Sequence, residues 1–286
     1  MVNSRIHGLV EQGQISLSVG VYDVLSAKLA EKAGFKAVVV SGYAVAASIL
    51  GEPDIGLLTK TEILEVARRI VNAVSIPVIV DGDTGYGGVL NVMQLVKELI
   101  AIRASGVLLE DQTWPKRCGH MRGKSVIDAE EHVQKIKAAV EARGENNLVI
   151  VARTDSIATH GVEEAIRRGN LYKQAGADVI FVEAPNNKEE MKRLVAGIKA
   201  PLTANMIEGG KTPIMTLEEL KEIGYAGVGY PLTGILSAAK AMSSAFNHLI
   251  IKGDSLGLLD KMMIFDEFTT VVGLEEKMRL DEKYKS

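Results

Sequence analysis

Residues 173–183 read Lys-Gln-Ala-Gly-Ala-Asp-Val-Ile-Phe-Val-Glu: the end of a helical pattern, a glycine, an unbroken apolar run and a closing carboxylate. The same pattern occurs at 31–41 and 103–110, and in a looser form at 222–230. Glycine often follows a helix because it adopts the left-handed conformation at little cost. Apolar runs without alternation are typical of parallel strands buried on both faces. The repeats therefore predict helix–strand units of one kind along the chain.

Eight such runs lie along the chain, and helical patterns separate most of them. Thr59 and Thr216 each precede a glutamate by three residues, which is typical of a capping box at the start of a helix. Alternating strands and helices in 286 residues predict a (β/α)₈ barrel of the TIM type. The expected strands are Ile15–Gly20, Ala37–Ser41, Val78–Asp81, Val107–Glu110, Leu148–Arg153, Val179–Glu183, Leu202–Asn205 and Gly227–Tyr230. The clearest helical patterns are Thr61–Val74, Leu90–Ala104, Ala129–Ala142 and Glu163–Ala175.

An open, doubly wound sheet is the alternative arrangement of these units. No Gly-x-Gly-x-x-Gly motif follows the first strand, which disfavours a dinucleotide-binding domain of that type. The chain has no linker, charge block or low-complexity stretch, so residues 1–254 are interpreted as one barrel domain. Residues 255–286 carry many apolar side chains and predict a helical extension. Its apolar face must pack on the barrel or on a neighbouring subunit, and we favour the subunit contact.

The composition disfavours several classes of protein. The chain is 47% hydrophobic and 24% charged, with a net charge of -3, which argues against a nucleic-acid-binding surface or a membrane-surface patch. No apolar run approaches the roughly 18 residues that a membrane span needs. A single cysteine cannot form an internal disulfide or a cysteine-based zinc site. Together with the polar start at residues 1–14, this predicts a cytoplasmic protein.

Polar side chains close most of the expected strands. The carboxyl ends of barrel strands meet at one face, and ligands bind there. Buried carboxylates in such number need a cation, and oxygen ligands favour Mg²⁺ or Mn²⁺ over zinc. The polar residues at these ends are Ser41, Asp81, Asp83, Glu110, Asp111, Arg153, Asp155, Glu183 and Asn205.

The most specific element among them is the acidic turn Asp81-Gly82-Asp83. Residues two apart on an extended segment point the same way, so Asp81 and Asp83 can address one ion. Glu110 from the next strand strengthens this prediction. The alternative interpretation is a tight acidic turn without a ligand.

Arg153 follows a buried apolar run and is expected at the same face. A planar guanidinium is suited to clamping a carboxylate and polarising a carbonyl group. A structural ion pair with Asp155 or Glu183 is the alternative, and we favour the functional interpretation. The stretch Ser41-Gly42-Tyr43 offers a hydroxyl and backbone N–H groups to an anionic ligand, although this signal is weak by itself.

The only cysteine lies in the loop Lys116-Arg117-Cys118-Gly119-His120, which is rich in basic residues. Neighbouring cations stabilise a thiolate and lower the pKa of the thiol, so we expect a tuned thiol at Cys118. The glycines of the loop allow it to close over a site. A solvated basic loop with an incidental cysteine is the alternative.

The motifs quoted above resemble those of the isocitrate lyase/phosphoenolpyruvate mutase superfamily, from about Val21 to Ala245. This resemblance implies a barrel whose last helix is swapped with a neighbour, in dimers that pair into homotetramers. The resemblance implies further that Mg²⁺ lies on Asp81 and Asp83, with Glu110 and Asp54 nearby through water. The groups implied to hold the substrate are Ser41, Gly42, Tyr43, Gly119, His120, Arg153, Glu183 and Asn205, and Cys118 is the implied proton donor on a gating loop.

One departure from the superfamily pattern bears on the substrate. Leu236 stands where isocitrate and methylisocitrate lyases carry an arginine for an additional carboxylate. We therefore expect a buried apolar side chain there, and a substrate with one carboxylate fewer. The tyrosine at position 43, directly after Ser41-Gly42, also resembles the sequence pattern of the subgroup that contains dimethylmalate lyase, petal-death proteins and oxaloacetate hydrolase.

The predicted function is Mg²⁺-dependent retro-aldol cleavage of a 2,3-dimethylmalate-like 2-hydroxy dicarboxylate to pyruvate and a short acid. Tyr43 or a carboxylate is the expected base, and Cys118, His120 and Arg153 are the other expected catalytic residues. A methylisocitrate lyase and an oxaloacetate hydrolase are the alternatives, and a phosphonomutase or a non-enzymatic barrel is less favoured.

Overall fold

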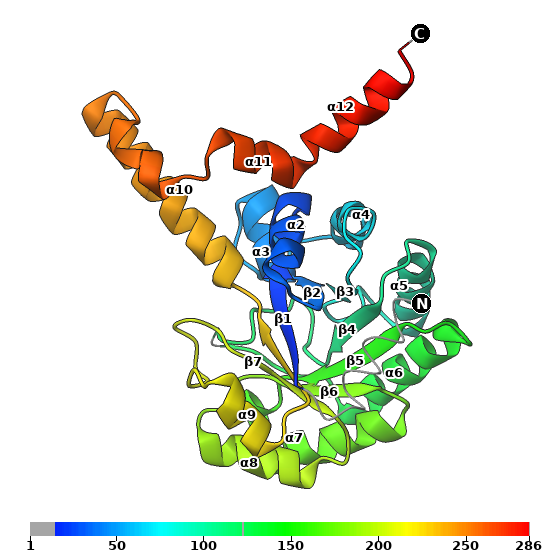
Figure 1. The fold of residues 1–286 in the computed structure, drawn as a ribbon. Coiled ribbons are helices and arrows are strands. Elements are labelled where there is room, and N and C mark those ends of the chain that lie inside the picture. The colour runs from blue at the N-terminus through cyan, green and yellow to red at the C-terminus, as the bar shows by residue number, and fades with distance from the viewer. Residues whose placement is uncertain (1–14, 122, 286) are drawn as a thin grey trace. The chain divides into compact units, whose positions relative to one another are not determined.

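The computed structural model describes residues 15–121 and 123–285, and it contains a closed barrel of eight parallel strands (Figure 1). Each strand pairs with the next along the chain, and the last pairs with the first. The predicted TIM-type barrel is therefore confirmed. The strands are β1 (Ser16–Val21), β2 (Ala37–Val40), β3 (Val78–Asp81), β4 (Gly106–Glu110), β5 (Val149–Thr154), β6 (Val179–Val182), β7 (Leu202–Asn205) and β8 (Gly227–Tyr230).

Helices follow the strands and cover the outside of the barrel (Figure 1). Thr59 and Thr216 form the two predicted capping boxes at the starts of α4 and α9. The helices up to β8 are α2 (Val24–Ala33), α3 (Gly42–Val45), a π-helix (Ala46–Leu50), α4 (Lys60–Val71), α5 (Val89–Ala101), α6 (Ala129–Arg143), α7 (Ile157–Gln174), α8 (Lys188–Gly197) and α9 (Leu217–Ile223).

The glycine of the repeated pattern takes the left-handed conformation in three of its four occurrences. Gly34, Gly176 and Gly224 have φ values of 97°, 104° and 106°. In the fourth occurrence Arg103 turns left-handed, with φ 65°, and Gly106 belongs to β4. A Cβ at Gly106 would lie 3.0 Å from the carbonyl oxygen of Val149, so the glycine serves the close approach of two strands there.

The strands contribute to two apolar cores. The larger core joins their outward-facing residues to the covering helices. A smaller core inside the barrel consists of Val149, Val151 and Phe181, with Ile79, Leu108 and Val179 packed against it. The strand ends that carry the predicted site residues are thus supported from both sides.

The chain divides into two compact units, one up to Thr233 and one from Gly234 to Ser286. The sequence placed this boundary after residue 254, whereas the structure assigns nearly the whole of the long helix α10 to the second unit. That unit contains α10 (Thr233–Lys252), a 3₁₀-helix (Leu256–Lys261), α11 (Phe265–Val272) and α12 (Leu274–Lys283).

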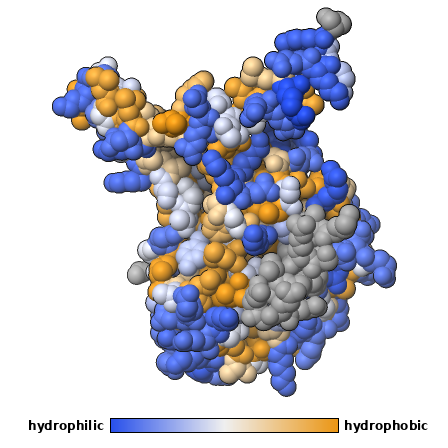
Figure 2. All heavy atoms as spheres, in the orientation of Figure 1, coloured by the Kyte–Doolittle hydropathy of each residue, from blue (hydrophilic) through white to orange (hydrophobic). Residues whose placement is uncertain are grey.

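The helices of the second unit expose many apolar side chains, which appear as orange patches in Figure 2. Ile250, Leu256 and Phe265 are 87%, 76% and 78% exposed. Among the described helices none has both the length and the apolar character required to cross a membrane. The predicted polar start at 1–14 lies outside the described residues.

Candidate active site

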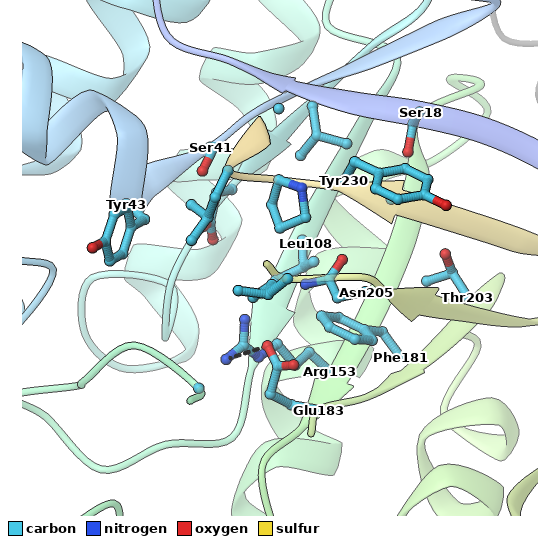
Figure 3. Close-up of a pocket in the computed structure, with 18 of the residues that line it drawn as sticks. Ser18, Ser41, Tyr43, Leu108, Arg153, Phe181, Glu183, Thr203, Asn205 and Tyr230 are labelled. Carbon is cyan, nitrogen blue, oxygen red and sulfur yellow. Dashed lines mark ion pairs between the residues drawn. The ribbon is translucent and has the colours of Figure 1, made fainter. Parts of the chain in front are cut away.

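A cavity of about 110 Å³ lies at the carboxyl ends of the strands (Figure 3). All eight strands contribute residues to its wall, together with several of the loops that follow them. The predicted site residues that line it are Ser41, Tyr43, Asp54, Asp81, Cys118, Gly119, Arg153, Glu183 and Asn205. Gly42, Asp83, Glu110 and His120 support these side chains from behind, through the contacts described below.

The acidic side of the cavity holds an internal cation, Lys116. Its Nζ lies 2.5 Å from Asp54 Oδ1 and 2.6 Å from Asp83 Oδ1, and only 3% of its side chain is exposed. Burial opposes the charge, but the carboxylates of Asp83, Glu110 and Asp54 raise the pKa of Lys116 well above its usual value. Lys116 therefore stays protonated and neutralises part of the acidic cluster.

Backbone groups hold Asp81 in place at the end of β3. Its Oδ1 accepts a hydrogen bond from the N–H of Asp83 at 3.1 Å, and its Oδ2 accepts one from the N–H of Gly42 at 3.2 Å. A Cβ at Gly42 would lie 2.9 Å from Asp81 Oδ2, so only glycine allows this approach without a shift. The start of α3 and the end of β3 are thereby joined at the site.

Asp83 and Glu110 are both buried and incompletely satisfied. Asp83 Oδ2 and Glu110 Oε1 have no hydrogen-bond donor among the described residues. Burial raises the pKa of Asp83 to about 6 and the pKa of Glu110 well above its usual value. A cation near these oxygens would compensate the cost of burying them.

The acidic cluster fits a magnesium ion better than a metal held by protein ligands alone. Across residues 15–121 and 123–285, no three Asp, Glu, His or Cys side chains converge on one point as a ready ligand set. Mg²⁺ usually binds through one or two carboxylates and completes its octahedron with water and substrate oxygens. Asp81 beside the partly unsatisfied Asp83 meets this requirement.

Arg153 lies at the centre of the opposite, charged side of the cavity. Its Nε is 2.8 Å from Asp155 Oδ2 and 3.4 Å from Glu110 Oε2, and its Nη2 is 3.0 Å from Glu183 Oε2. Its guanidinium carbon stands 5.2 Å from the centre of the Phe181 ring. Both predicted ion-pair partners of Arg153 are thus present, while Nη1 makes no hydrogen bond within the described part of the chain and is available to a ligand.

Glu183 connects Arg153 to the cysteine loop. Its Oε1 lies 3.1 Å from Nε2 of His120, and Nδ1 of His120 accepts a hydrogen bond of 2.8 Å from the backbone N–H of Lys211. Because Nδ1 accepts, Nε2 carries the proton that is donated to Glu183. Burial acts against the charge of Glu183, but Arg153 and His120 hold the pKa of Glu183 below its usual value.

The loop after β4 is closed over the cavity by a second lysine. Lys124 Nζ lies 2.7 Å from Asp155 Oδ1 and also donates a hydrogen bond to the carbonyl oxygen of Gly119. The backbone N–H of Cys118 donates to the carbonyl oxygen of Asp54 at 3.0 Å. Asp155 therefore joins the loop to Arg153.

Gly119 leaves no room for a side chain. A Cβ there would lie 2.3 Å from Glu183 Cγ and 2.5 Å from Arg153 Nη2. We expect Gly119→Ala to lower kcat/KM by roughly 10²-fold, because either the loop or the Arg153–Glu183 pair must move by about 1 Å. Steady-state kinetics would check this, with Gly88→Ala as a control, because a Cβ at Gly88 would meet no atom within 4 Å. Equal activities of the two variants and the wild type would contradict the closed loop.

The Cys118 thiol does not behave as the sequence predicted. Burial, and to a lesser degree the nearby Glu183 and Asp54, raise the pKa of Cys118 to about 11, although a hydrogen bond from the backbone of His120 works in the other direction. The expectation of a thiol acidified by neighbouring cations was therefore wrong. Lys116 and Lys124 are already paired with carboxylates, so their charge is not available to the sulfur.

The raised pKa predicts slow alkylation of Cys118. The thiolate fraction at pH 8 is about a hundredfold smaller for a pKa of about 11 than for an ordinary pKa near 9. The rate of carbamidomethylation by iodoacetamide, followed by mass spectrometry between pH 7 and pH 11, should therefore keep rising up to pH 11. A plateau below pH 9 would show an acidic thiol instead.

Comparison with known proteins agrees with this geometry. A family model described as phosphoenolpyruvate phosphomutase matches residues 6–250. The chain belongs to the phosphoenolpyruvate mutase/isocitrate lyase superfamily. It is 51% identical to the petal death protein of Dianthus caryophyllus, over 99% of this chain and 89% of that protein. It is 42% identical to 2,3-dimethylmalate lyase of Eubacterium barkeri, over 98% of this chain and 97% of that protein.

Solved structures of the superfamily show the same fold. A crystal structure of 2,3-dimethylmalate lyase superposes with a TM-score of 0.93 at 36% identity, over 99% of this chain and 94% of that chain. Oxaloacetate acetylhydrolase with 3,3-difluorooxalacetate gives a TM-score of 0.93 at 33% identity, over 99% and 96%. Relatives named 2-methylisocitrate lyase also match, one of them in Aeropyrum pernix at 41% identity, over 96% of this chain and 88% of that protein. Lyases and a hydrolase are thus among the relatives of this superfamily member.

Leu236 does not have the role that its sequence position suggested. Its side chain is 42% exposed, and it is absent from the described residues that line the cavity. The expectation of a buried apolar side chain at this position was therefore wrong. The leucine that does line the cavity is Leu232, four residues earlier, which is only 6% exposed.

Three charged residues of the site were not predicted as functional from the sequence. Lys116 and Lys124 were noted only as basic residues of the loop, and Asp155 only as a strand-end residue and a partner for Arg153. The signal that could have found Asp155 is its position two residues after Arg153, because side chains two apart on an extended strand point to the same side. Nothing in the spacing of the lysines indicates which carboxylates they would reach.

Proposed function

We propose that this chain is a Mg²⁺-dependent carbon–carbon lyase acting on a 2-hydroxy dicarboxylate of the 2,3-dimethylmalate type. The products would be pyruvate and a short carboxylic acid. The observation that carries the proposal is the meeting of Cys118, Arg153 and Asp81 around one enclosed cavity. A proton donor, a carboxylate clamp and an acidic cation site are the groups that a retro-aldol cleavage of such a substrate requires.

The cation site would be formed by Asp81 and Asp83, with Glu110 and Asp54 close by. When bound, Mg²⁺ or Mn²⁺ supplies a Lewis acid that polarises the C2 oxygen and orients the adjacent carboxylate. Lys116 balances the remaining acidic charge from the other side of Asp83.

The pyruvate half of the substrate would lie between β2 and β5. Nη1 of Arg153 can donate to a substrate oxygen, because Nε and Nη2 are occupied by Asp155 and Glu183. The Ser41 hydroxyl oxygen accepts a hydrogen bond from the N–H of Ala44, and its own O–H can donate to a substrate oxygen.

The leaving acid would lie under the cysteine loop. Cleavage of the C2–C3 bond leaves negative charge on C3 and its carboxylate. The side-chain amide of Asn205 is the donor on this side of the site, next to the charged pair of Arg153 and Glu183, and His120 holds Glu183 in place through its Nε2. Donors held in advance at the position of developing charge lower the barrier most effectively.

Proton transfers at the two ends of the bond would use different groups. Cys118, with a pKa of about 11, is a protonated thiol at neutral pH and can protonate C3. Burial and the nearby Cys118 and Asp54 raise the pKa of Tyr43, so its phenol also remains protonated and serves better as a donor than as a base. Asp54, which lines the cavity, is the proposed acceptor of the substrate hydroxyl proton.

The cations of the cavity favour a dicarboxylate over a tricarboxylate. Lys116 and Arg153 are the basic residues among the described lining residues, and both are already paired with carboxylates. A third substrate carboxylate would lack a partner, which is costly in a buried site. This disfavours methylisocitrate and leaves oxaloacetate hydrolysis as the second candidate, supported by the structural similarity to oxaloacetate acetylhydrolase.

Product analysis with three substrates tests the proposal. The enzyme would be incubated with racemic 2,3-dimethylmalate, 2-methylisocitrate and oxaloacetate in the presence of Mg²⁺, and the products identified by NMR. We expect pyruvate and propionate from dimethylmalate at the highest kcat/KM of the three. Pyruvate from methylisocitrate alone, or acetate and oxalate from oxaloacetate, would contradict this assignment.

The second unit is proposed to associate with other copies of the chain. Its exposed apolar residues include Phe246, Ile250 and Phe265, and exposed apolar surface of this kind is typical of an association site. We propose a homotetramer with exchanged C-terminal helices. Light scattering should give four times the chain mass of 30.7 kDa, and Phe246→Glu with Ile250→Glu should reduce that mass. A wild-type monomer at micromolar concentration would contradict the proposal.

A further inference from the structure

Asp111 is a buried carboxylate beside the active site that the proposed chemistry does not use. It directly follows Glu110 at the end of β4, and it is absent from the described residues that line the cavity. Its exposed fraction is 0%, and a buried carboxylate is costly unless donors satisfy both of its oxygens. The donors around Asp111 therefore identify the parts of the chain that this residue joins.

Three side chains donate hydrogen bonds to Oδ2 of Asp111. Two of them come from α7, namely Nη1 of Arg168 at 2.9 Å and the hydroxyl of Tyr172 at 2.7 Å. The third is the hydroxyl of Thr154 on β5, at 2.7 Å. Arg168 is itself only 4% exposed, and its Nη1 also donates to the carbonyl oxygen of Ile127 at 2.8 Å. This oxygen thus joins the end of β4 to α7 and β5 through contacts that are shielded from solvent.

The other oxygen of Asp111 holds the backbone just beyond β5. Oδ1 accepts a hydrogen bond of 3.0 Å from the N–H of Asp155. The paired register of β4 and β5 ends at Glu110 and Arg153, so the side chain of Asp111 continues the connection between the strands beyond their last pair. Because a backbone N–H and a guanidinium can only donate, both oxygens are acceptors and Asp111 is ionised.

Asp155 transmits this constraint to the active site. Its side chain pairs with Arg153, at 2.8 Å from Nε and 3.1 Å from Nη2, and with Lys124 Nζ at 2.7 Å. Arg153 lies in the pocket beside Glu183 (Figure 3), and Lys124 also donates to the carbonyl oxygen of Gly119 in the cysteine loop. A shift of the Asp155 backbone would therefore move the guanidinium and the loop together.

We propose that Asp111 is a positioning residue, which fixes the backbone of Asp155 and thereby the orientation of Arg153 and the closed state of the cysteine loop. α7 and β5 hold Asp111, Asp111 holds Asp155, and the side chain of Asp155 holds both the guanidinium and the loop. The part of this inference that concerns turnover rests on the proposed function. The part that concerns closure of the loop does not depend on it.

Replacing Asp111 by asparagine tests its two oxygens separately. The amide keeps one acceptor oxygen and presents a donor NH₂ group in place of the other. Three donors, one of them a buried guanidinium, face the Oδ2 position, and a single N–H faces the Oδ1 position. The amide oxygen is therefore expected to turn toward α7, which leaves the NH₂ group opposite the N–H of Asp155. Two donors repel each other, so Asp155 is displaced.

Asp111→Asn should lower kcat/KM for pyruvate release from 2,3-dimethylmalate with Mg²⁺ by roughly 10²-fold, the effect of a displacement of about 1 Å at a positioned group. The rate of carbamidomethylation of Cys118 at pH 8 should rise roughly tenfold, because a less firmly closed loop exposes the thiol more often. Loop opening does not require turnover, so the alkylation rate tests the inference even if dimethylmalate is not the substrate. Urea unfolding would give the stability of each variant.

Tyr172→Phe is the matched control. It removes one donor from the Oδ2 side of Asp111, while the hydrogen bond from the N–H of Asp155 to Oδ1 is kept. The variant should unfold at a lower urea concentration than the wild type, because a buried hydrogen bond is lost. Its kcat/KM and its rate of Cys118 alkylation should stay within about twofold of the wild type. A purely structural Asp111 predicts instead that both quantities follow the loss of stability in the two variants alike.

Wild-type kcat/KM and wild-type alkylation in Asp111→Asn would overturn the inference, as would a Tyr172→Phe variant that changes both as much as Asp111→Asn does. Hydrogen exchange of the wild type tests the inference where Asp111→Asn does not fold. The amide of Asp155 should exchange at least about 10³-fold more slowly than in the unfolded chain, and a difference of less than about tenfold would overturn the inference. A wild type that releases no pyruvate, together with faster alkylation of Cys118 in Asp111→Asn, would overturn the proposed function alone.

Discussion

Replacing Cys118 by serine is expected to reduce kcat for dimethylmalate cleavage by about 10²–10⁴, the usual contribution of a general acid. Serine has nearly the shape of cysteine, but its hydroxyl is a much weaker acid, so the carbanion at C3 would be protonated slowly. The position of Cys118 over the cavity makes it the proposed donor to that carbon. Steady-state release of pyruvate would measure the effect.

Binding of a product provides the control for this variant. Cys118→Ser should bind pyruvate in the presence of Mg²⁺ with an affinity within about twofold of the wild type, because the groups that hold pyruvate are unchanged. Deuterium in the methylene group of propionate made in D₂O would report the same protonation step. A variant with near-normal kcat would remove Cys118 from the mechanism.

Replacing Arg153 by methionine is expected to reduce both stability and activity. The change leaves Glu183, Asp155 and Glu110 without their common cation, and all three are buried. Breaking a buried ion pair from one side costs about 3–5 kcal/mol in the free energy of unfolding. Loss of the clamp on the substrate carboxylate should lower kcat/KM by about 10³ in addition.

Arg167 offers a matched control for this variant. It forms ion pairs with Glu164 and Glu130 on the surface of α7, and its side chain is 48% exposed. Arg167→Met should change the free energy of unfolding by only about 0.5 kcal/mol and leave kcat/KM unchanged. Urea unfolding of both variants would measure the difference. Equal loss of stability at the two positions would contradict the central place of Arg153 in the charged cluster.

The barrel could be predicted from the sequence because each strand is bounded by strong local signals. All eight expected strands end within one residue of the observed ones. A residue with positive φ follows the preceding helix at β2, β4, β5, β6 and β8, and an unbroken apolar run then leaves few alternatives to a buried parallel strand. The strand ends in turn identify the face of the site, which is why Asp81, Arg153, Glu183 and Asn205 were found.

The properties that depend on the path of the loop were not predictable in this way. Sequence places five basic residues around Cys118, but it does not show that Lys116 reaches Asp54 and Asp83 or that Lys124 reaches Asp155. These pairings remove the cations from the thiol, and burial then decides its pKa. The prediction that Leu236 is buried was wrong for a related reason. The position of a residue in a sequence motif does not determine on which face of α10 its side chain lies.

Metal-dependent release of pyruvate from 2,3-dimethylmalate is the most direct test of the central claim. The enzyme would be treated with EDTA, assayed, and assayed again after addition of Mg²⁺ or Mn²⁺. We expect pyruvate and propionate in equal amounts with either metal and almost none with EDTA. Equal rates in all three conditions, or no pyruvate in any of them, would contradict a Mg²⁺-dependent lyase acting on this substrate.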